Sequence, residues 1–411
     1  MNTKPFLITG ILVTIIIGFF VFGIVSAKNT EHPLFSFSEN FERSTQKNII
    51  LQPLQQDQNL TDTNSEKIQI TDSDVTSVQN SVTTKHLITP KTVRAVYMSA
   101  WTASSKVDRD KLLDFISNST INAVVLDIKD ATGRVSFLTN DPIVKQTGSP
   151  ENKISDIDQF IQELHQKNIY VIGRISVFQD PYLTAKYPEW AIQSNTTKKP
   201  WKDHKGLSFL DPTNKKVWDY INALAQESYK RGFDEINFDY IRFPSDGNMK
   251  DIVYPESSGT RADMIESFFV YIHSKMSMAG IPTSADLFGL TTEAVDDMGI
   301  GQVLEKALPN FDFISPMIYP SHYGKGYAGF TNPADHPYQV IIQAMKEGVR
   351  RARIIGFGPE KFRPWIQDFD MGAKYDKIKI LDQIKALQEH GITSFMVWDP
   401  ANHYTRDAYQ Q

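Results

Sequence analysis

Two aspartates lie near the ends of short apolar runs that read as buried strands. Asp239 lies in EINFDYIRF, and Asp286 lies in IPTSADLFG, the next such run along the chain. If these runs are neighbouring parallel strands, their carboxyl groups lie at the same edge of the sheet. Two such carboxyls can cleave a glycosidic bond, because one donates a proton to the leaving oxygen while the other attacks the anomeric carbon or activates water. We predict that both are catalytic, and the sequence does not distinguish the two roles.

Other polar and aromatic side chains near the ends of similar runs are candidates for contact with substrate. A nearby lysine or arginine would hold one carboxyl ionised, and a more apolar setting would keep the other protonated. Aromatic rings suit stacking on sugar faces, although they are also common in protein cores. The predicted substrate-binding residues are Asp127, Lys129, Arg174, Arg242, Tyr319, His322, Trp365, Trp398 and Asp399.

Each candidate also has a purely structural explanation. A single Asp at a strand end is commonly a helix cap or an ion-pair partner, and Asp127 could form a buried ion pair with Lys129. The two arginines could pair with scaffold acids, and Glu293 is a spare acid. Asp234 lies at the opposite end of the strand that carries Asp239, and we predict that it is structural only.

These residues are positioned by eight apolar runs that alternate with amphipathic segments at helical spacing. This alternation predicts an α/β fold, a (β/α)8 TIM barrel, whose active site lies at the C-terminal ends of the strands. An open doubly wound sheet is the alternative, although no Gly-x-Gly-x-x-Gly follows the first strand. The predicted strands are 93–101, 122–130, 169–178, 235–243, 281–289, 311–319, 351–359 and 392–400.

The strand period of two assigns side chains to faces of the fourth predicted strand. Asn237, Asp239 and Ile241 share one face, which we predict to point toward the barrel axis. A carboxylate that faced the helix layer would be buried away from water, which is costly. The same period groups Asp127 with Lys129, Ser284 with Asp286, and Met317 with Tyr319.

The chain before the first run divides into two parts. Residues 1–28 contain an uncharged, mostly apolar stretch between Lys4 and Lys28, long enough to span a bilayer. We predict a membrane anchor, or a signal peptide cleaved after Val25-Ser26-Ala27. The remaining chain is then expected outside the cytoplasm, as a single-pass membrane protein or a secreted one. We predict that residues 29–90 form a disordered polar linker and that residues 91–411 form the folded domain.

Composition narrows the possible partners and chemistry. The 411 residues are 41% hydrophobic and 22% charged, which is ordinary for a globular chain, and the net charge of −5 argues against nucleic acid as a partner. The chain contains no cysteine, so disulfides and a Cys nucleophile are excluded. No His-Glu-x-x-His spacing and no Gly-x-Ser-x-Gly elbow occur, and we predict neither a metal nor a cofactor. The oligomeric state is not predicted.

Six segments together resemble one bacterial family. They are VRAVYMSAW, NAVVLDIKDATGRV, YVIGRISVFQDP, FDEINFDYIRFPSDG, ISPMIYPSHY and FMVWDP, and the similarity covers residues 92–405. That family is a domain of unknown function regarded as glycoside-hydrolase-like, with an expected TIM-barrel fold. The resemblance implies hydrolysis of glycosidic bonds in a polysaccharide or oligosaccharide.

Two wider groups of barrels are similar to the fourth strand. FDYIRFP resembles barrels related to the α-amylases, whose implied nucleophile matches Asp239 and whose acid lies on the fifth strand, near Asp286. That acid is usually Glu, so Asp286 departs from the pattern. Chitinase-like barrels resemble EINFDYI through Asn237 and Asp239. Ile241 stands where their catalytic Glu would be, which argues against substrate-assisted chitinase chemistry.

We therefore interpret the chain as a glycoside hydrolase that acts on a cell-envelope or extracellular polysaccharide. The alternative is a non-catalytic cell-surface carbohydrate-binding barrel, which the missing Glu on the fourth and fifth strands favours. A lyase or esterase on the same barrel stays open, because a fold does not determine its chemistry.

Overall fold

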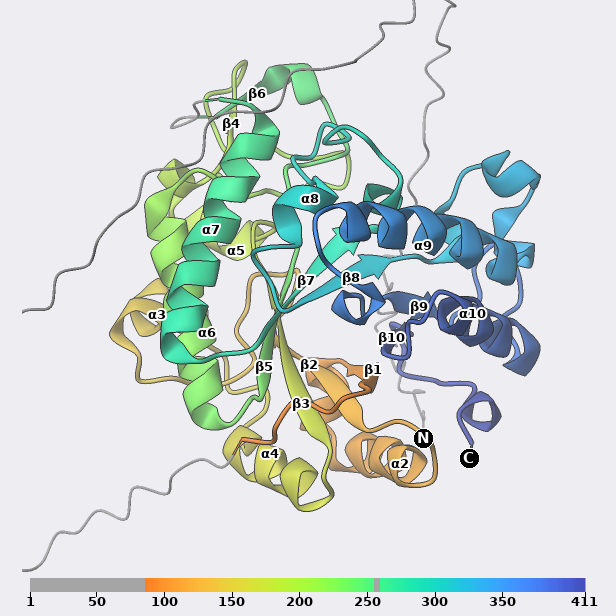
Figure 1. The fold of residues 1–411 in the computed structure, drawn as a ribbon. Helices are drawn as coiled ribbons and strands as arrows, with labels where there is room; N and C mark the ends of the chain where they lie inside the picture. Colours follow the sequence, from red (N-terminus) through yellow and green to blue (C-terminus); the bar gives the residue numbers. More distant parts are fainter. Residues whose placement is uncertain (1–85, 255–258, 411) are drawn as a thin grey trace, which may run out of the picture. The chain divides into compact units, whose positions relative to one another are not determined.

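Eight parallel strands close into a barrel in the order β1-β10-β9-β8-β7-β5-β3-β2, with helices outside the strands (Figure 1). The computed structural model describes residues 86–254 and 259–410. This closure confirms the predicted (β/α)8 barrel and excludes the open sheet. The strands are β1 (Arg94–Met98), β2 (Ala123–Lys129), β3 (Tyr170–Ser176), β5 (Glu235–Asp239), β7 (Thr283–Phe288), β8 (Phe313–Met317), β9 (Trp365–Gln367) and β10 (Phe395–Trp398).

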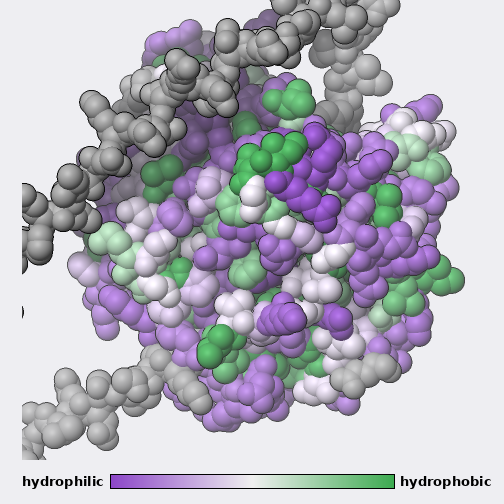
Figure 2. All heavy atoms as spheres, viewed as in Figure 1, coloured by the Kyte–Doolittle hydropathy of each residue, from purple (hydrophilic) through white to green (hydrophobic). Residues whose placement is uncertain are grey.

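The helices alternate with these strands, as the sequence predicts. Their apolar faces pack against the outside of the barrel, and the surface seen in Figure 2 is mostly hydrophilic with small scattered hydrophobic patches. The helices are α1 (Ala100–Ser104), α2 (Lys106–Ser117), α3 (Pro142–Thr147), α4 (Ile157–Gln166), α5 (Pro181–Lys186), α6 (Lys215–Arg231), α7 (Arg261–Ala279), α8 (Leu304–Ala307), α9 (Pro337–Ile354) and α10 (Lys377–Glu389).

The two faces of strands β1 and β2 contribute to two separate hydrophobic clusters. Ala95 on β1 and Val125 on β2 belong to the cluster inside the barrel. Their neighbours Val96 and Val124 belong to the larger cluster between strands and helices. This alternation follows from the strand period of two, because every second side chain of a strand points into the barrel.

The seventh strand was predicted in the wrong place. Residues 351–359 form the end of α9 and the loop after it, whereas the strand is β9, fourteen residues further on. Ile354 and Ile355 suggested a strand, yet their side chains are 68% and 41% exposed. The apolar residues before them recur every three or four positions, which continues the helix instead. β9 is only three residues long, so its period of two was too short to detect.

A small insertion extends the loops that follow the C-terminal ends of β3 and β5. Strand β4 (Gln193–Ser194) in the first loop pairs in antiparallel fashion with β6 (Ile252–Val253) in the second. Ile192, Trp201 and Phe209 form a separate hydrophobic cluster beneath this pairing. The insertion therefore has its own small core beside the C-terminal ends of the barrel strands.

The opposite end of the barrel carries structural charges. The Asp234 carboxylate accepts hydrogen bonds from the backbone of Leu87 at 2.7 Å and of Val171 at 2.9 Å, and lies 2.9 Å from His165 Nε2. Glu235 forms a fully buried ion pair with Arg363 at 2.7 Å. The structure thus gives Asp234 the structural position predicted for it.

The predicted anchor of residues 1–28 and most of the predicted linker of residues 29–90 lie outside the described residues. Within residues 86–254 and 259–410, no helix is long and apolar enough to cross a membrane.

A buried aspartate fastens the C-terminal segment and should make stability depend on pH. Asp368 accepts hydrogen bonds from the backbone and hydroxyl of Thr405 at 2.9 and 2.6 Å and from Tyr409 Oη at 3.0 Å. Burial raises the pKa of Asp368 from 3.8 to about 6. The folded state therefore binds the proton of Asp368 more tightly than the unfolded state does, so protonated Asp368 stabilises the fold. This contribution to the free energy of unfolding, roughly 3 kcal/mol at most, is lost as the pH rises through 6.

We expect Asp368→Asn to flatten the fall in unfolding free energy between pH 4 and pH 7. Urea unfolding of the two proteins across that range measures this slope. An identical slope in the variant would show that Asp368 does not titrate as its burial implies.

Candidate active site

One guanidinium gathers three aspartates at the C-terminal ends of the strands. Arg174 on β3 donates from Nη1 to Asp127 Oδ1 at 2.7 Å, and from Nε and Nη2 to Asp239 Oδ2 at 3.1 and 2.5 Å. Its Nε lies 4.0 Å from Asp286 Oδ2. These four side chains come from neighbouring strands β2, β3, β5 and β7, and each is at least nine-tenths buried. The structure therefore brings the predicted pair of carboxyls together around one cation.

The backbone after Asp239 is held in an uncommon conformation. Tyr240 has φ of 53°, in the left-handed region that bulky residues rarely occupy. In this conformation its N–H donates to Asp239 Oδ1 at 2.6 Å. The Asp239 carboxylate therefore accepts hydrogen bonds on both oxygens, which fixes its orientation and stabilises its negative charge. Such strain is typical of functional sites.

This turn of the backbone also corrects one prediction. Asn237 and Asp239 share the inner face, as the period of two predicts. Ile241 does not join them, because the strand ends at Asp239 and Ile241 packs in the hydrophobic cluster outside the barrel.

Asp286 has a different environment from Asp239. Its Oδ1 accepts hydrogen bonds from Asn237 Nδ2 and Trp365 Nε1, both at 2.8 Å, and the residue is 1% exposed. Burial, and then the charge of Asp239, raise the pKa of Asp286 well above its ordinary value, while Arg174 opposes them. Asp286 therefore keeps its proton at a pH where ordinary carboxyls have lost theirs.

The two carboxyls are suited to opposite tasks. Asp239 accepts two hydrogen bonds from the Arg174 guanidinium, whereas burial raises the pKa of Asp286. Pairs of carboxyls whose environments separate them in this way commonly divide the roles of acid and of nucleophile or base. An oxygen of each carboxyl lies within 4.0 Å of the same Arg174 nitrogen.

A tyrosine that the sequence analysis did not single out completes the arrangement. Tyr97 on β1 donates from Oη to Asp127 Oδ2 at 2.6 Å and stacks on Trp398 at 4.1 Å between ring centroids. The Trp398 ring lies 5.2 Å from the Arg174 guanidinium. Burial first, and then the charge of Asp127, raise the pKa of Tyr97, so the phenol remains a donor. Tyr97 lies two residues after Ala95, so the strand period could have identified it.

One protein family matches most of the described domain. The model of a family described as "Putative glycosyl hydrolase domain" matches residues 95–404. The chain belongs to this family. The predicted family resemblance is therefore confirmed, and membership supports a glycoside hydrolase-like function. No curated protein matches the chain.

Two solved structures are similar to the chain. A hypothetical protein from Ruminiclostridium thermocellum is 35% identical, with 50% of this chain and 98% of that chain covered, and a TM-score of 0.43. The PgaB (BpsB) glycoside hydrolase domain from Bordetella bronchiseptica is 14% identical over 77% of this chain and 97% of that chain, with a TM-score of 0.54. At that identity, the second comparison shows the barrel fold alone.

Several predicted contacts of this glycosyl hydrolase domain differ in the structure. Lys129 does not pair with Asp127, because a register shift separates the two residues along β2. Its Nζ instead lies 2.8 Å from Asp180 Oδ2 and donates to the carbonyl of Ser176 at 2.5 Å. Lys129 and Asp180 are both fully buried, and Asp180 also caps α5 through the backbone of Leu183. Lys129 is therefore structural.

Trp365 and Asp399 were also predicted to contact substrate at the rim. Trp365 is 1% exposed and lies within β9, where its indole N–H donates a hydrogen bond to Asp286 Oδ1. Asp399 accepts hydrogen bonds from the backbone of Ala401 at 2.6 Å and of His403 at 3.3 Å, so its carboxylate holds the turn after β10. The buried Trp365 ring therefore offers no stacking surface to a sugar.

The remaining predicted contacts surround the mouth of the barrel. Tyr319 is buried and meets His322 edge to face at 5.2 Å between ring centroids. His322 is half-buried, and burial lowers its pKa. Trp398 is half-buried above Arg174, and Arg242 lies in the loop after β5. Within residues 86–254 and 259–410, no group of His, Asp and Glu side chains is arranged to hold a metal ion.

The indole of Trp365 should affect the pKa of Asp286. Its N–H donates to Asp286 Oδ1 and favours the ionised form of the carboxyl. We expect Trp365→Phe to raise the pKa of Asp286 further, by roughly one unit, since one hydrogen bond contributes about 1 kcal/mol. A ¹³C NMR titration of the aspartate carboxyls measures this shift. Trp398→Phe is the matched control, and an unchanged Asp286 in the Trp365 variant would contradict the assignment.

Proposed function

We propose that the chain is a glycoside hydrolase in which Asp286 is the proton donor and Asp239 the nucleophile. The observation that carries the proposal is the contrast between the two carboxyls on neighbouring strand ends. Burial raises the pKa of Asp286 well above its ordinary value, whereas Asp239 accepts hydrogen bonds from Arg174 and the Tyr240 backbone. Family membership supports the same reaction class.

The reaction takes two steps. Asp286 donates its proton to the glycosidic oxygen as Asp239 attacks the anomeric carbon, so the leaving sugar departs as a neutral alcohol and a glycosyl ester forms on Asp239. Asp286, now ionised, then accepts a proton from water as that water attacks the anomeric carbon and releases Asp239. Direct attack requires carboxyls about 5 Å apart. The distances of 3.1 and 4.0 Å from Arg174 Nε to Asp239 and Asp286 allow this separation.

Arg174 has the role of a positioning residue for the nucleophile. It donates two hydrogen bonds to Asp239 and one to Asp127, and Tyr97 fixes the other oxygen of Asp127. This network holds the attacking carboxylate in one orientation before substrate arrives, which lowers the reorganisation that the transition state requires.

We also propose that the domain acts outside the cytoplasm on a cell-envelope or extracellular polysaccharide, held by the N-terminal segment. The support is the uncharged apolar stretch between Lys4 and Lys28. Protease treatment of intact and permeabilised cells tests this location. Protection of the domain in intact cells that are otherwise accessible to protease would contradict it.

The experiment for the activity uses the full-length chain in detergent with a panel of polysaccharides. Release of reducing ends that is lost in Asp239→Asn would support hydrolysis, and ¹H NMR of the first product would report its anomeric configuration. Retention is expected from direct attack by Asp239, and inversion would make Asp239 a general base instead. Binding without cleavage across the whole panel would favour the non-catalytic carbohydrate-binding barrel.

A further inference from the structure

A buried cation near the two carboxyls makes its hydrogen bonds to neutral groups. Arg242 is 5% exposed and lies in the loop between β5 and α7. Within the described residues, its Nη1 donates to the carbonyl of Phe243 at 3.0 Å and to Ser245 Oγ at 3.4 Å. The carboxylate of Asp239 instead accepts hydrogen bonds from Arg174 and from the backbone of Tyr240. Burial lowers the pKa of Arg242, and the charges of neighbours, Asp239 and Asp203 among them, oppose this only in part. A buried cation that has no direct ion pair with a carboxylate is costly, so such a group commonly binds a ligand.

Arg242 lies close to both strands that carry the proposed catalytic carboxyls. Its guanidinium carbon lies 5.2 Å from the centre of the Tyr240 ring and 4.7 Å from that of the Phe288 ring. Tyr240 directly follows Asp239, and Phe288 lies two residues after Asp286. Arg242 therefore lies between the ends of the two strands that carry the proposed catalytic carboxyls, next to the position of a sugar at the cleavage point.

We propose that the substrate is an acidic glycan and that Arg242 binds the carboxylate of a uronic-acid-type sugar beside the cleaved bond. This substrate class rests on the proposed function for its catalytic part. A guanidinium matches a carboxylate through two parallel hydrogen bonds, which gives orientation as well as affinity. A neutral sugar would leave the charge of Arg242 unmatched in a nearly buried site, so it would bind more weakly.

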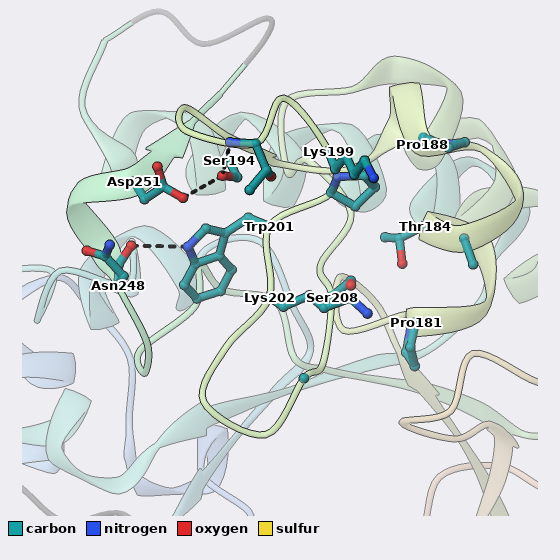
Figure 3. Close-up of a pocket in the computed structure, with 14 residues that line it drawn as sticks. Pro181, Thr184, Pro188, Ser194, Lys199, Trp201, Lys202, Ser208, Asn248 and Asp251 are labelled. Atoms are coloured by element: carbon teal, nitrogen blue, oxygen red, sulfur yellow. Dashed lines mark hydrogen bonds between the residues drawn. The ribbon is translucent and has the colours of Figure 1, made fainter.

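A second observation comes from the insertion beside the barrel mouth. Residues 198–205, KKPWKDHK, contain four lysines and one aspartate in a chain whose net charge is −5. Lys199 and Lys202 line a pocket of about 780 Å³ between this segment and α5 (Figure 3). The overall net charge did not reveal this local basic segment, which suits an anionic polymer.

The pocket is connected to the loop that holds Arg242. Trp201 Nε1 donates to the carbonyl of Asn248 at 3.1 Å, as Figure 3 shows. A side chain at Gly247 would approach the Trp201 ring to 2.6 Å, so only glycine allows this contact. The segment from Arg242 to Asn248 thus runs from the proposed catalytic carboxyls to the wall of the basic pocket. An acidic polymer that extends from the cleavage point can reach Lys199 and Lys202 along this segment.

The test compares uronic-acid polymers with the same polymers after reduction of their carboxyls to alcohols. The full-length chain carrying Asp239→Asn is used in detergent, so that cleavage does not interfere with measurement of Kd. We expect at least a tenfold weaker Kd for the reduced polymer. The additional change Arg242→Gln should make the two polymers equal, while Arg353→Gln, on the exposed surface of α9, should preserve the tenfold difference.

The outcomes separate this proposal from the proposed hydrolysis. Equal affinity for native and reduced polymers, or a difference that persists in Arg242→Gln, would overturn recognition of the carboxylate. Tighter binding of sulfated or phosphodiester polymers than of any uronic-acid polymer would also overturn it. Arg242-dependent binding of acidic polymers that the unmodified chain never cleaves would support recognition while hydrolysis fails. The comparison of native and reduced polymers needs no Arg242 variant, so it holds even if that variant does not fold.

The basic pocket has its own readout. We expect the double change Lys199→Gln and Lys202→Gln to weaken binding of an acidic polymer at least threefold and to leave binding of an acidic disaccharide unchanged. The polymer effect should diminish as salt is added, because exposed charges are screened. An unchanged polymer affinity would remove the pocket from the proposal.

Discussion

Asp239→Asn is expected to lower kcat/KM by about 10³-fold or more while the barrel remains folded. The amide has nearly the same shape as the carboxylate but cannot attack the anomeric carbon. It also removes the anion that Arg174 holds through two hydrogen bonds. The loss should appear in kcat for every substrate, because no other carboxyl in the cluster has this position on β5.

The matched control is Asp399→Asn. Asp399 also follows a barrel strand, but its carboxylate holds the turn after β10 through the backbone of Ala401 and His403. Its replacement should reduce stability by about 1 kcal/mol and change kcat/KM by less than tenfold. Initial rates and thermal unfolding of both variants make the comparison. A Asp239→Asn variant with more than a tenth of the original activity would exclude Asp239 as the nucleophile.

The sequence predicted the barrel and the inner face of β5 because both depend on short periodic patterns. Asn237 and Asp239 are two residues apart in a strand that is buried on both faces, so the polar pair could only point to the axis. The same reasoning failed for Ile241, since the left-handed backbone at Tyr240 ends the strand. A bulky residue in that conformation has no local sequence signal.

Contacts that depend on several strands could not be predicted. Lys129 reaches Asp180 in the loop after β3, and a register shift in β2 separates it from Asp127. The different protonation of the two catalytic candidates has the same origin. The pKa of Asp286 depends on its burial and on groups from β3, β5 and β9, which the chain brings together only on folding. Sequence alone therefore predicted that the two carboxyls lie near one another but not the environments that distinguish them.

Asp286→Asn should remove the acid without disturbing its surroundings. The amide resembles the protonated carboxyl, and its oxygen can still accept hydrogen bonds from Asn237 and Trp365. We expect kcat/KM to fall by about 10²- to 10⁴-fold for natural glycosides, whose leaving oxygen requires a proton. For nitrophenyl glycosides the loss should be much smaller, because nitrophenolate leaves without one. Stability should be retained or increased, since the variant no longer buries an ionisable group.

The pH dependence of activity tests the role of Asp286 more specifically than the loss of rate does. Because burial and the charge of Asp239 raise the pKa of Asp286, the unmodified chain should keep its proton donor into a higher pH range and lose activity as the pH rises through that pKa. In Asp286→Asn this alkaline fall should disappear, because no proton remains to be lost at that position. Rates of both proteins with the same natural glycoside, whose leaving oxygen requires a proton, measure the two profiles across the pH range. An alkaline fall that persists in the variant would assign the proton donor to another group, and the division of roles between β5 and β7 would then fail.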